Sequence, residues 1–393
     1  MTIDRRTLLS GAGVLGLSAL GAPSASAHLA SSEAAGRGRS LQPGDTAYID
    51  VTAATLWCDA TIDGVEKRAW DVPRPGIDDA SLTNPVDLRA WNANMVDTET
   101  RAWLSGNFVL ETQGVMGTRV IVTERHEAWA KVIVPLQATP RADGNFGGIN
   151  GYPGWMPAVQ LSGADDFGAA MGSASLATVT SRYAWLSHDP RGRSRTTELA
   201  FDTVLPVVDR RLGGARVLRP NGSREWLSEA DVVVRAHGEL PPRPSGADIV
   251  ATARGLLGIR YLWAGVSSFG YDCSGFTYTC YRHHGLLLNR DAEPQRTNSG
   301  GQVIESGELT PDASVDREAW NVGQWQAADL AFFGSRREST GLLRASHVGM
   351  VAEPDAVDPL IIHSPSSDTT VKEQRLSELL AGGRQVVGIR RYL

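Results

Sequence analysis

One cysteine in this sequence stands where its side chain could act as a nucleophile. The stretch YLWAGVSSFGYDCSGFTYTCYRHHG, residues 261–285, places Cys273 between Asp272 and Ser274, at the start of an expected helix over 273–284. Asp272 can cap that helix, and the positive end of the helix dipole with its unpaired backbone N–H groups favours a thiolate. The pattern predicts a reactive, anionic Cys273, although a cysteine at a helix start is more often a packing residue.

A nucleophilic cysteine needs a base, and the base needs a group that orients it. Among the eight histidines, His347 and His363 lie in the apolar runs SHVGMV and LIIHSP, where a buried imidazole needs a polar partner. Neighbouring antiparallel strands can set two such rings side by side, facing a helix. A core histidine that is merely hydrogen-bonded gives the same pattern. The other histidines are expected in a tether, in turns, in a linker or on the surface of the cysteine-bearing helix: His28, His126, His188, His237, His283 and His284.

The elements around these residues indicate an α+β domain. Ser245 and Asp248 form a capping-box pattern ahead of a helix that ends at Gly258. Helices followed by strands predict helices packed on an antiparallel sheet. The strand-like apolar runs lie at 328–334, 346–353, 359–365 and 386–393.

The preceding part, from about residue 45 to 235, is expected to be all β. The runs 119–124 and 130–135 predict a hairpin, and 151–161 predicts a turn into a last strand with Trp155 as a core residue. A similar order recurs over 203–234. Two weakly similar β units of this size predict a duplicated small barrel, and both resemble bacterial SH3-like domains. A generic β-sandwich is the alternative.

Composition shifts divide the chain into segments. Residues 1–27 have the organisation of an export signal, because Arg5 and Arg6 precede an apolar run that ends in small residues. The paired arginines indicate the twin-arginine route, and an N-terminal membrane anchor is the alternative. The expected divisions are a signal peptide (1–27), a disordered tether (28–44), a first barrel (45–165), a second barrel (166–236), a linker (237–246) and the α+β domain (247–393).

Composition narrows the chemistry further. The formal net charge of −6 gives no electrostatic basis for nucleic-acid binding, and an apolar content of 42% excludes bulk disorder. We expect an exported protein, secreted or in the cell envelope, with no integral membrane segment once the signal is removed. The three cysteines, Cys58, Cys273 and Cys280, lack the spacing of a disulfide framework, so free thiols are expected. No cofactor or metal is expected.

Over residues 245–393 the chain resembles the NlpC/P60 family of cysteine peptidases. The segments YLWAG, FGYDCSGF, NRDAEPQ, ADLAFFG, SHVGMV and IIHSP occur in the order found in that family. The resemblance implies a papain-like fold and hydrolysis of amide bonds in cell-wall peptides. It also implies that Cys273 is the nucleophile, His347 the base and His363 the group that orients the base. Ala264 and Ala328 stand where the family commonly has glycine, and Asn289 where it often has proline.

The resemblance implies roles for other residues of these motifs. Tyr261 matches a tyrosine that stabilises the oxyanion or holds substrate, and Asp272 and Ser274 match substrate-binding positions. Arg290 and Asp291 match a segment that shapes the pocket on the acyl side. An aspartate at the second of these positions can pair with the free amine of a substrate, and a helix cap is its alternative role.

The arrangement of two SH3-like units ahead of a peptidase domain resembles the full-length architecture of γ-D-glutamyl-L-diamino acid endopeptidases. The resemblance implies that the first barrel narrows the cleft and that the segment GYPGW reaches over it, with Tyr152 as a contact. A cleft closed in this way would select peptidoglycan stem peptides or murein fragments with a free N-terminal L-Ala. The diamino acid after the glutamate is expected to be diaminopimelate or lysine.

Other functions stay open on the residues alone. The protein could bind cell wall with an inactive peptidase domain, or act as a cysteine amidase or acyltransferase of the same fold. A zinc hydrolase would use Cys273, Cys280, His283 and His284, but their spacing matches neither C-x-x-C nor H-E-x-x-H. The segment 296–327 and an arginine-rich one at 335–345 look longer than the minimal family connections and are expected to form a rim, a lid or mere surface.

Overall fold

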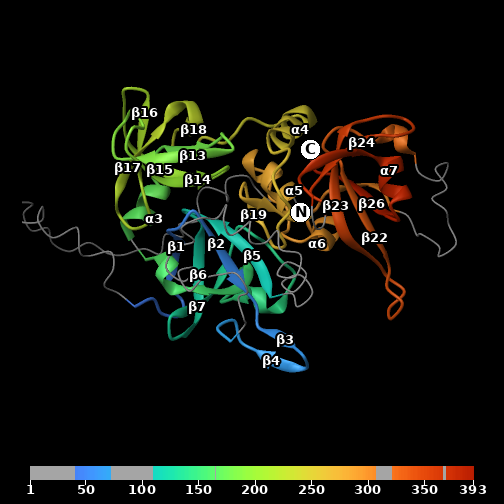
Figure 1. Cartoon of the computed structure of the whole chain (residues 1–393), viewed down its shortest axis with the longest axis horizontal. Helices are drawn as coiled ribbons and strands as arrows, with labels where there is room; N and C mark the ends of the chain where they lie inside the picture. The colour runs from blue at the N-terminus through green and yellow to red at the C-terminus, as the bar shows by residue number, and fades with distance from the viewer. Residues whose placement is uncertain (1–39, 72–108, 164, 307–320, 366–368) are drawn as a thin grey trace, which may run out of the picture.

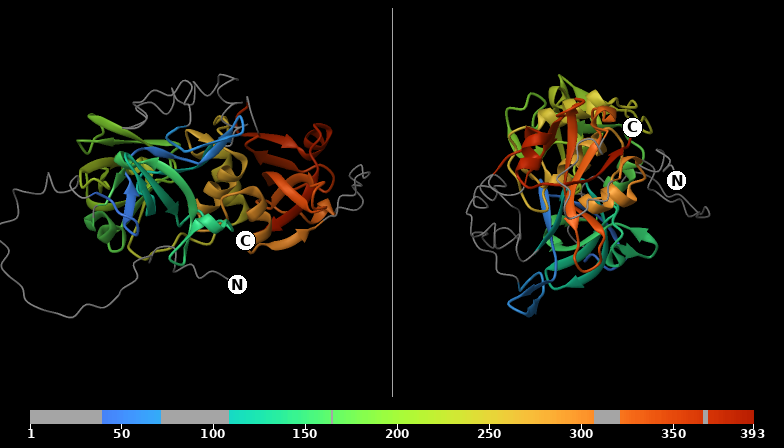
Figure 2. Two further views of the ribbon diagram at one scale, coloured as in Figure 1. Left: turned by 90° about the horizontal axis from the view of Figure 1, so that it is seen from below. Right: turned by 90° about the vertical axis from the view of Figure 1, so that its right-hand side faces the viewer.

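The computed structural model describes residues 40–71, 109–163, 165–306, 321–365 and 369–393. They form two β units and one mixed unit, whose helices over residues 246–255 and 273–283 lie between its own sheet and the β units (Figure 1, Figure 2). The expected signal peptide, most of the tether and part of the segment 296–327 fall outside the described residues. No helix in the described ranges is long and apolar enough to cross a membrane.

The first β unit is a seven-stranded antiparallel sheet with the order β11-β1-β6-β7-β10-β2-β5. The expected hairpin is present, since Ile121 pairs with Ile133 across β6 and β7. Trp155 is 2% exposed, which confirms it as a core residue. The elements are β1 (Thr46–Ile49), β2 (Ala53–Trp57), β3 (Ala60–Ile62), β4 (Val65–Lys67), β5 (Leu110–Val115), β6 (Arg119–His126), β7 (Trp129–Val134), η4 (Ala142–Gly144), β8 (Asn145–Phe146), β9 (Ile149–Asn150), β10 (Tyr152–Pro157), η5 (Ala158–Gln160) and β11 (Leu161–Ser162).

The second β unit is also a seven-stranded antiparallel sheet, with the order β14-β13-β17-β16-β15-β12-β18. A short helix, α3 (Asp165–Met171), joins it to the first and buries Phe167 in its core. The other elements are β12 (Leu176–Val179), β13 (Tyr183–Ser187), β14 (Arg195–Ala200), β15 (Val204–Arg211), β16 (Gly214–Leu218), β17 (Arg224–Ser228), η6 (Glu229–Asp231) and β18 (Val232–Arg235).

The third unit packs helices on a six-stranded antiparallel sheet with the order β21-β26-β22-β23-β24-β25. This arrangement confirms the predicted α+β class. The four later strand runs were predicted, whereas β21, β25, α6 and α7 were not. The elements are α4 (Gly246–Gly255), β19 (Val266–Ser267), β20 (Gly270–Tyr271), α5 (Cys273–His283), α6 (Ala292–Asn298), β21 (Gln302–Glu305), η7 (Val322–Gln324), β22 (Leu330–Arg336), β23 (Leu343–Glu353), β24 (Leu360–His363), β25 (Lys372–Arg375), α7 (Leu376–Ala381) and β26 (Val386–Arg391).

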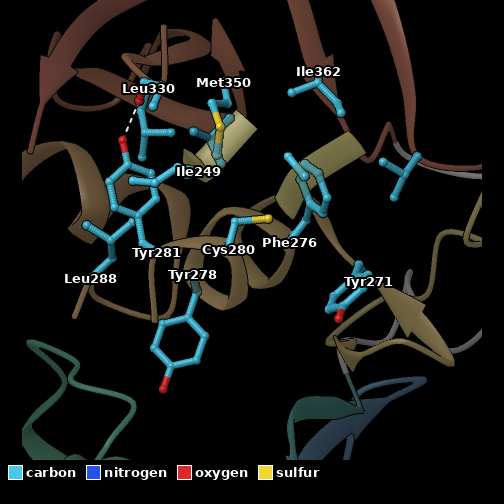
Figure 3. Packing of buried hydrophobic residues seen from close by; sticks show 14 of the residues in the cluster. Ile249, Tyr271, Phe276, Tyr278, Cys280, Tyr281, Leu288, Leu330, Met350 and Ile362 are labelled. Atoms are coloured by element: carbon cyan, nitrogen blue, oxygen red, sulfur yellow. Dashed lines mark hydrogen bonds between the residues drawn. The ribbon is translucent and has the colours of Figure 1, made fainter. Parts of the chain in front are cut away.

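Helix α5 is fixed by a core that reaches from α4 to the sheet. Phe276 and Cys280 point into this core, where they meet Ile249 of α4 and strand residues such as Met350 (Figure 3). The hydroxyl of Tyr281 donates to the carbonyl oxygen of Ala328. A helix anchored along its length in this way holds its first residue in a constant position relative to the sheet.

The start of α5 depends on two residues of the motif DCSG. Asp272 caps the helix, and its Oδ1 accepts a hydrogen bond of 2.6 Å from the backbone N–H of Gly275. A side chain at Gly275 would collide with the carbonyl oxygen of Gly265, so only glycine lets the helix start approach this loop. The motif DCSG therefore serves the backbone conformation of the helix start as well as the chemistry of the cysteine.

At two positions where this chain departs from the family pattern, the backbone conformation favours the usual glycine. Ala264 and Ala328 have φ angles of 63° and 70°, in the left-handed region that favours glycine. Each alanine there costs about 1 kcal/mol or more relative to ordinary backbone geometry. The glycines common at these positions thus relieve strain that this chain retains.

Both β units are tied to the α+β unit by polar contacts. From the first unit, the carbonyl oxygen of Leu136 accepts from the Tyr278 hydroxyl (2.9 Å) and that of Leu110 from the Trp263 indole (3.2 Å). From the second unit, Asp202 accepts from Nε of Arg282 at 2.7 Å and lies 3.0 Å from Nδ1 of His283. The expectation that His283 covers surface is therefore wrong, because this ring lies at a domain interface.

The contact between Asp202 and Arg282 is an almost fully buried ion pair, with exposed side-chain fractions of 4% and 13%. Burial alone would raise the pKa of Asp202, but Arg282 and a hydrogen bond from His283 hold the pKa below its ordinary value. The pair therefore stays charged, and each partner depends on the other for its solvation.

Asp202→Asn should destabilise the protein by about 3 kcal/mol, because it leaves the Arg282 guanidinium buried against a neutral group. Asparagine tolerates the φ of 63° at this position, so backbone strain does not confound the result. Thermal or urea denaturation measures the effect. The control is Asp209→Asn, which breaks an exposed 2.6 Å pair with Arg211 and should cost less than about 1 kcal/mol. Equal losses from the two variants would contradict the assignment.

Candidate active site

The structure brings the predicted cysteine and both histidines to one place. Cys273 is the first residue of α5, His347 lies in β23 and His363 ends the neighbouring strand β24. The backbone N–H of Val348, next to His347, lies close enough to the sulfur of Cys273 to lower the pKa of the thiol. Cys273 is half-buried, and the two imidazoles are 3% and 0% exposed.

The two imidazoles form a hydrogen-bonded chain that continues to a third side chain. Nε2 of His347 lies 2.8 Å from Nδ1 of His363, and Nε2 of His363 lies 2.9 Å from Oε1 of Gln374 in β25. Strand pairing produces this chain, because β23, β24 and β25 are neighbours in the sheet. Gln374 was not predicted as a site residue.

The chain fixes which ring nitrogens carry protons. The side-chain oxygen of Gln374 can only accept, so Nε2 of His363 carries the proton and its Nδ1 is an acceptor. Nε2 of His347 must then donate to that Nδ1. The remaining nitrogen of His347, Nδ1, is left without a proton and can act as a base.

Burial keeps both imidazoles neutral. It lowers the pKa of His347 well below its ordinary value, with further lowering from Arg384 and His363. It lowers the pKa of His363 to about 4, although the hydrogen bond to Gln374 acts in the opposite direction. Neutral rings in defined tautomers are the form that proton abstraction requires.

The expectation of a resting thiolate is wrong for the free protein. Burial raises the pKa of Cys273 to about 12, and the charge of Asp272 adds to the rise. The backbone N–H groups of Val348 and Ser274 and the charge of Arg290 lower the pKa, but by less than burial raises it. Desolvation thus outweighs the helix terminus, and the resting pair is a thiol with a neutral imidazole.

Cys273 and His347 open into one cleft of about 920 Å³. One wall comes from the first β unit and includes Glu111, Arg141 and Tyr152. The opposite wall comes from the α+β sheet. Its lining residues are Ser335, Arg337, Arg344, Ala345, Ser346, His347 and Arg384. The arginines of this wall and Glu111 were not predicted as site residues.

One end of the cleft gathers acidic and phenolic groups. The hydroxyl of Tyr152 donates to the carboxylate of Asp291, at 3.0 Å from Oδ2 and 3.2 Å from Oδ1. Asp291 stands at the start of α6 but its side chain makes no capping hydrogen bond, so the alternative role of helix cap does not hold. Burial raises the pKa of Asp291, while Arg290 and Tyr152 lower it. Glu111 lies at the same end and pairs with Arg141 at 2.6 Å.

Arg290 lies behind the cleft wall rather than on it. Its guanidinium is 1% exposed and binds both carboxylate oxygens of Asp272, at 2.6 and 3.1 Å. It also donates to the Ser274 hydroxyl at 3.2 Å and to the Thr112 hydroxyl of the first β unit at 2.8 Å. Arg290 therefore holds the residues on both sides of Cys273 in place.

The remaining predicted residues are divided between the cleft and the core. Tyr261 lines the cleft, and burial raises the pKa of its hydroxyl well above the ordinary value, with a further rise from Cys273. Cys280 is fully buried in the core (Figure 3), and His284 bonds to Thr252 at 2.8 Å. Within the described residues, no three His, Cys, Asp or Glu side chains gather as metal ligands would. The three cysteines are free thiols.

This geometry has counterparts among known proteins. The NlpC/P60 family matches residues 258–389, and the YKFC SH3b2 domain matches residues 179–234. A Gamma-D-glutamyl-L-lysine dipeptidyl-peptidase of Bacillus cereus is 36% identical over 350 residues, which cover 88% of this chain and 91% of that protein. One of Bacillus subtilis is 29% identical over 310 residues, covering 79% and 90%.

A solved structure is also similar over most of its length. The crystal structure of an NlpC/P60 family protein from Bacillus cereus has a TM-score of 0.71 and 34% identity, and covers 89% of this chain and 100% of that chain. The predicted resemblance to peptidases with an SH3-like domain is thereby confirmed.

Gln374→Glu should raise the pKa of the imidazole pair by about one unit or more, because a carboxylate beside His363 favours its protonated form. NMR titration of the histidine side chains measures the change; in the wild type both pKa values lie below the ordinary value for histidine. Gln302→Glu places the same charge on the exposed strand β21, at the other edge of the sheet, and should leave the titration unchanged. An unaltered titration in Gln374→Glu would show that Gln374 is not part of the hydrogen-bonded chain of side chains.

Proposed function

This chain belongs to the NlpC/P60 family of peptidases, and on that basis we propose that it is a cysteine peptidase of peptidoglycan stem peptides. Its reaction is hydrolysis of the bond between γ-D-glutamate and an L-diamino acid, lysine or diaminopimelate, in peptides with a free N-terminal L-Ala. The observation that carries the proposal is the chain from Gln374 through His363 to His347, which ends beside Cys273 in a common cleft.

In the first step, Nδ1 of His347 takes the proton of Cys273 as the sulfur attacks the γ-carbonyl carbon of glutamate. Because burial holds the thiol in its neutral form, proton transfer accompanies attack rather than preceding it. The negative charge moves to the carbonyl oxygen. The backbone N–H of Cys273, which has no acceptor within its own helix, and the Tyr261 hydroxyl stabilise that oxygen.

In the second step, the protonated His347 gives its proton to the nitrogen of the diamino acid, and the bond from that nitrogen to the acyl carbon breaks. Neutral amine leaves and a thioester to Cys273 remains. Water then attacks the thioester with His347 as base, which releases the dipeptide and restores the thiol. His363 and Gln374 keep the His347 tautomer constant and stabilise its transient positive charge.

The acidic end of the cleft explains selection for a free amino terminus. A substrate ammonium can bind the Asp291 carboxylate, with the Tyr152 hydroxyl oxygen nearby and Glu111 adding negative charge. Residues of the first β unit line the cleft at this end and would limit a longer chain on that side. Short stem peptides fit such a site, and intact cross-linked wall does not.

Two rival functions are less well supported. A binding module with an inactive domain would not need the aligned imidazole chain, because binding alone uses no base. An amidase or acyltransferase of the same fold shares the chain but has no use for a carboxylate site for an amine. The export-signal pattern of residues 1–27 supports a place of action outside the cytoplasm, in the cell envelope or the medium.

Cys273→Ala should abolish hydrolysis of L-Ala-γ-D-Glu-diaminopimelate, with a loss of at least about 10⁴-fold, while peptide binding persists. Product analysis by mass spectrometry and calorimetric binding measure the two effects. The matched control is Cys280→Ala, which removes the other thiol of the same helix from the core and should retain activity. Unchanged hydrolysis in Cys273→Ala would discard the thiol mechanism.

Asp291→Asn should reduce kcat/KM for the free-amine peptide by about 100-fold, because it removes a buried charge that meets the ammonium. The N-acetylated peptide has no ammonium, so its slower hydrolysis should change far less. In the wild type, kcat/KM for the free-amine peptide should fall as the pH drops through the raised pKa of Asp291, since protonation neutralises the carboxylate. Equal losses with both peptides would show that Asp291 does not bind the amine.

A further inference from the structure

The two sides of the cleft differ in charge, although Arg141, paired with Glu111, lies on the acidic side and Glu293, paired with Arg296, also lines the cleft. Asp291 and Glu111 lie at the end formed with the first β unit. Three arginines, Arg337, Arg344 and Arg384, lie on the wall formed by the sheet. Two of them come from the arginine-rich segment 335–345. A cleft with this polarity suits a ligand that is cationic at one end and anionic at the other.

Strand pairing places Arg384 two strands away from the histidine that must protonate the leaving amine. Val386 at the start of β26 pairs with Phe333 of β22, and Phe333 pairs with His347 of β23. Arg384 precedes this row by two residues. Its backbone N–H donates to the carbonyl oxygen of Leu379 at 3.1 Å, which fixes the loop between α7 and β26.

The charge of Arg384 acts directly on the reacting groups. It lowers the pKa values of His347 and His363. Burial lowers the pKa of Arg384 itself, while Cys273 and Tyr261 act to raise it. The guanidinium is half-buried, so it is neither a surface charge nor part of the core.

Arg384 differs from three ion-paired arginines around the site. Arg141, Arg282 and Arg290 each form an ion pair with a carboxylate at 2.6 or 2.7 Å. Among the described residues, no carboxylate pairs with Arg384. A half-buried cation without an anion is costly, and the cost is relieved when a ligand supplies the anion.

We propose that Arg384 binds a carboxylate of the leaving diamino acid and so determines which residue is accepted after γ-D-glutamate. The proposal rests on the proposed function, because His347 must reach the leaving nitrogen and therefore places the leaving residue against the sheet wall. A guanidinium suits a carboxylate because it donates two parallel hydrogen bonds. Arg337 and Arg344 extend the positive charge along the same wall.

The carboxylate can come from two parts of the leaving residue. One is the α-carboxylate of a C-terminal diamino acid. The other is the side-chain carboxylate that diaminopimelate has and lysine lacks. Three peptides separate these sources: L-Ala-γ-D-Glu-L-Lys, its C-terminal amide, and L-Ala-γ-D-Glu-meso-diaminopimelate amidated only at its α-carboxyl group.

Steady-state kinetics on these peptides test the proposal. If the α-carboxylate is bound, the wild type should hydrolyse the lysine acid at least about ten-fold better, by kcat/KM, than the lysine amide. If the side-chain carboxylate is bound, the amidated diaminopimelate peptide should exceed the lysine amide by a similar factor. In either case Arg384→Gln should bring the ratio close to one, chiefly through KM, and Arg384→Lys should retain part of it.

The matched control is Arg375→Gln, which removes one positive charge from an exposed guanidinium bound to the carbonyl oxygen of Asp358 and should keep the wild-type ratio. Wild-type ratios near one in both comparisons would overturn the proposal. The proposal would also be overturned if Arg384→Gln lost kcat/KM equally on all three peptides and shifted the pH profile. Arg384 would then act on Cys273 alone. Both results leave the proposed function standing. No cleavage of any peptide by the wild type would overturn both.

Discussion

The site depends on one hydrogen bond, from Nε2 of His363 to the side-chain oxygen of Gln374. An amide oxygen accepts and cannot donate, so it sets the tautomer of His363, and His363 in turn sets that of His347. Because burial keeps both rings neutral, Nδ1 of His347 stays free of a proton in the cleft that it shares with Cys273. Because β23, β24 and β25 are neighbours in the sheet, the amide of Gln374 on an edge strand determines which nitrogen of His347 is basic.

The three units of the chain share the work of building this site. The core of the α+β unit anchors α5 and so positions Cys273, while Arg290 links the residues beside Cys273 to the first β unit. The first β unit also supplies one wall of the cleft, and the second supports the far end of α5 through Asp202. Desolvation follows from this enclosure. It explains why the thiol and the imidazoles are neutral at rest, and it is consistent with the role proposed for Arg384, which has no carboxylate partner among the described residues.

Residues in regular apolar patterns could be predicted from the sequence, and residues recruited by tertiary contacts could not. The two histidines lie in strand-like runs and the cysteine at a capped helix start, so their convergence was predictable. Gln374 lies on the short polar strand KEQR, which has no apolar alternation, and only the sheet order places it beside His363. Arg384 follows a glycine turn, and nothing in that local sequence predicts a site residue. The thiol pKa was wrongly predicted because a helix terminus is visible in sequence whereas burial is not.

The central claim is that the tautomers of His347 and His363 are set by Gln374, and ¹⁵N NMR of the imidazole nitrogens near neutral pH tests it most directly. The account predicts that both rings carry a proton on Nε2 and none on Nδ1, because each Nε2 donates along the chain. A His347 ring protonated on Nδ1 alone would leave Cys273 without a base, and a ring protonated on both nitrogens would be a resting imidazolium; either result would contradict the account.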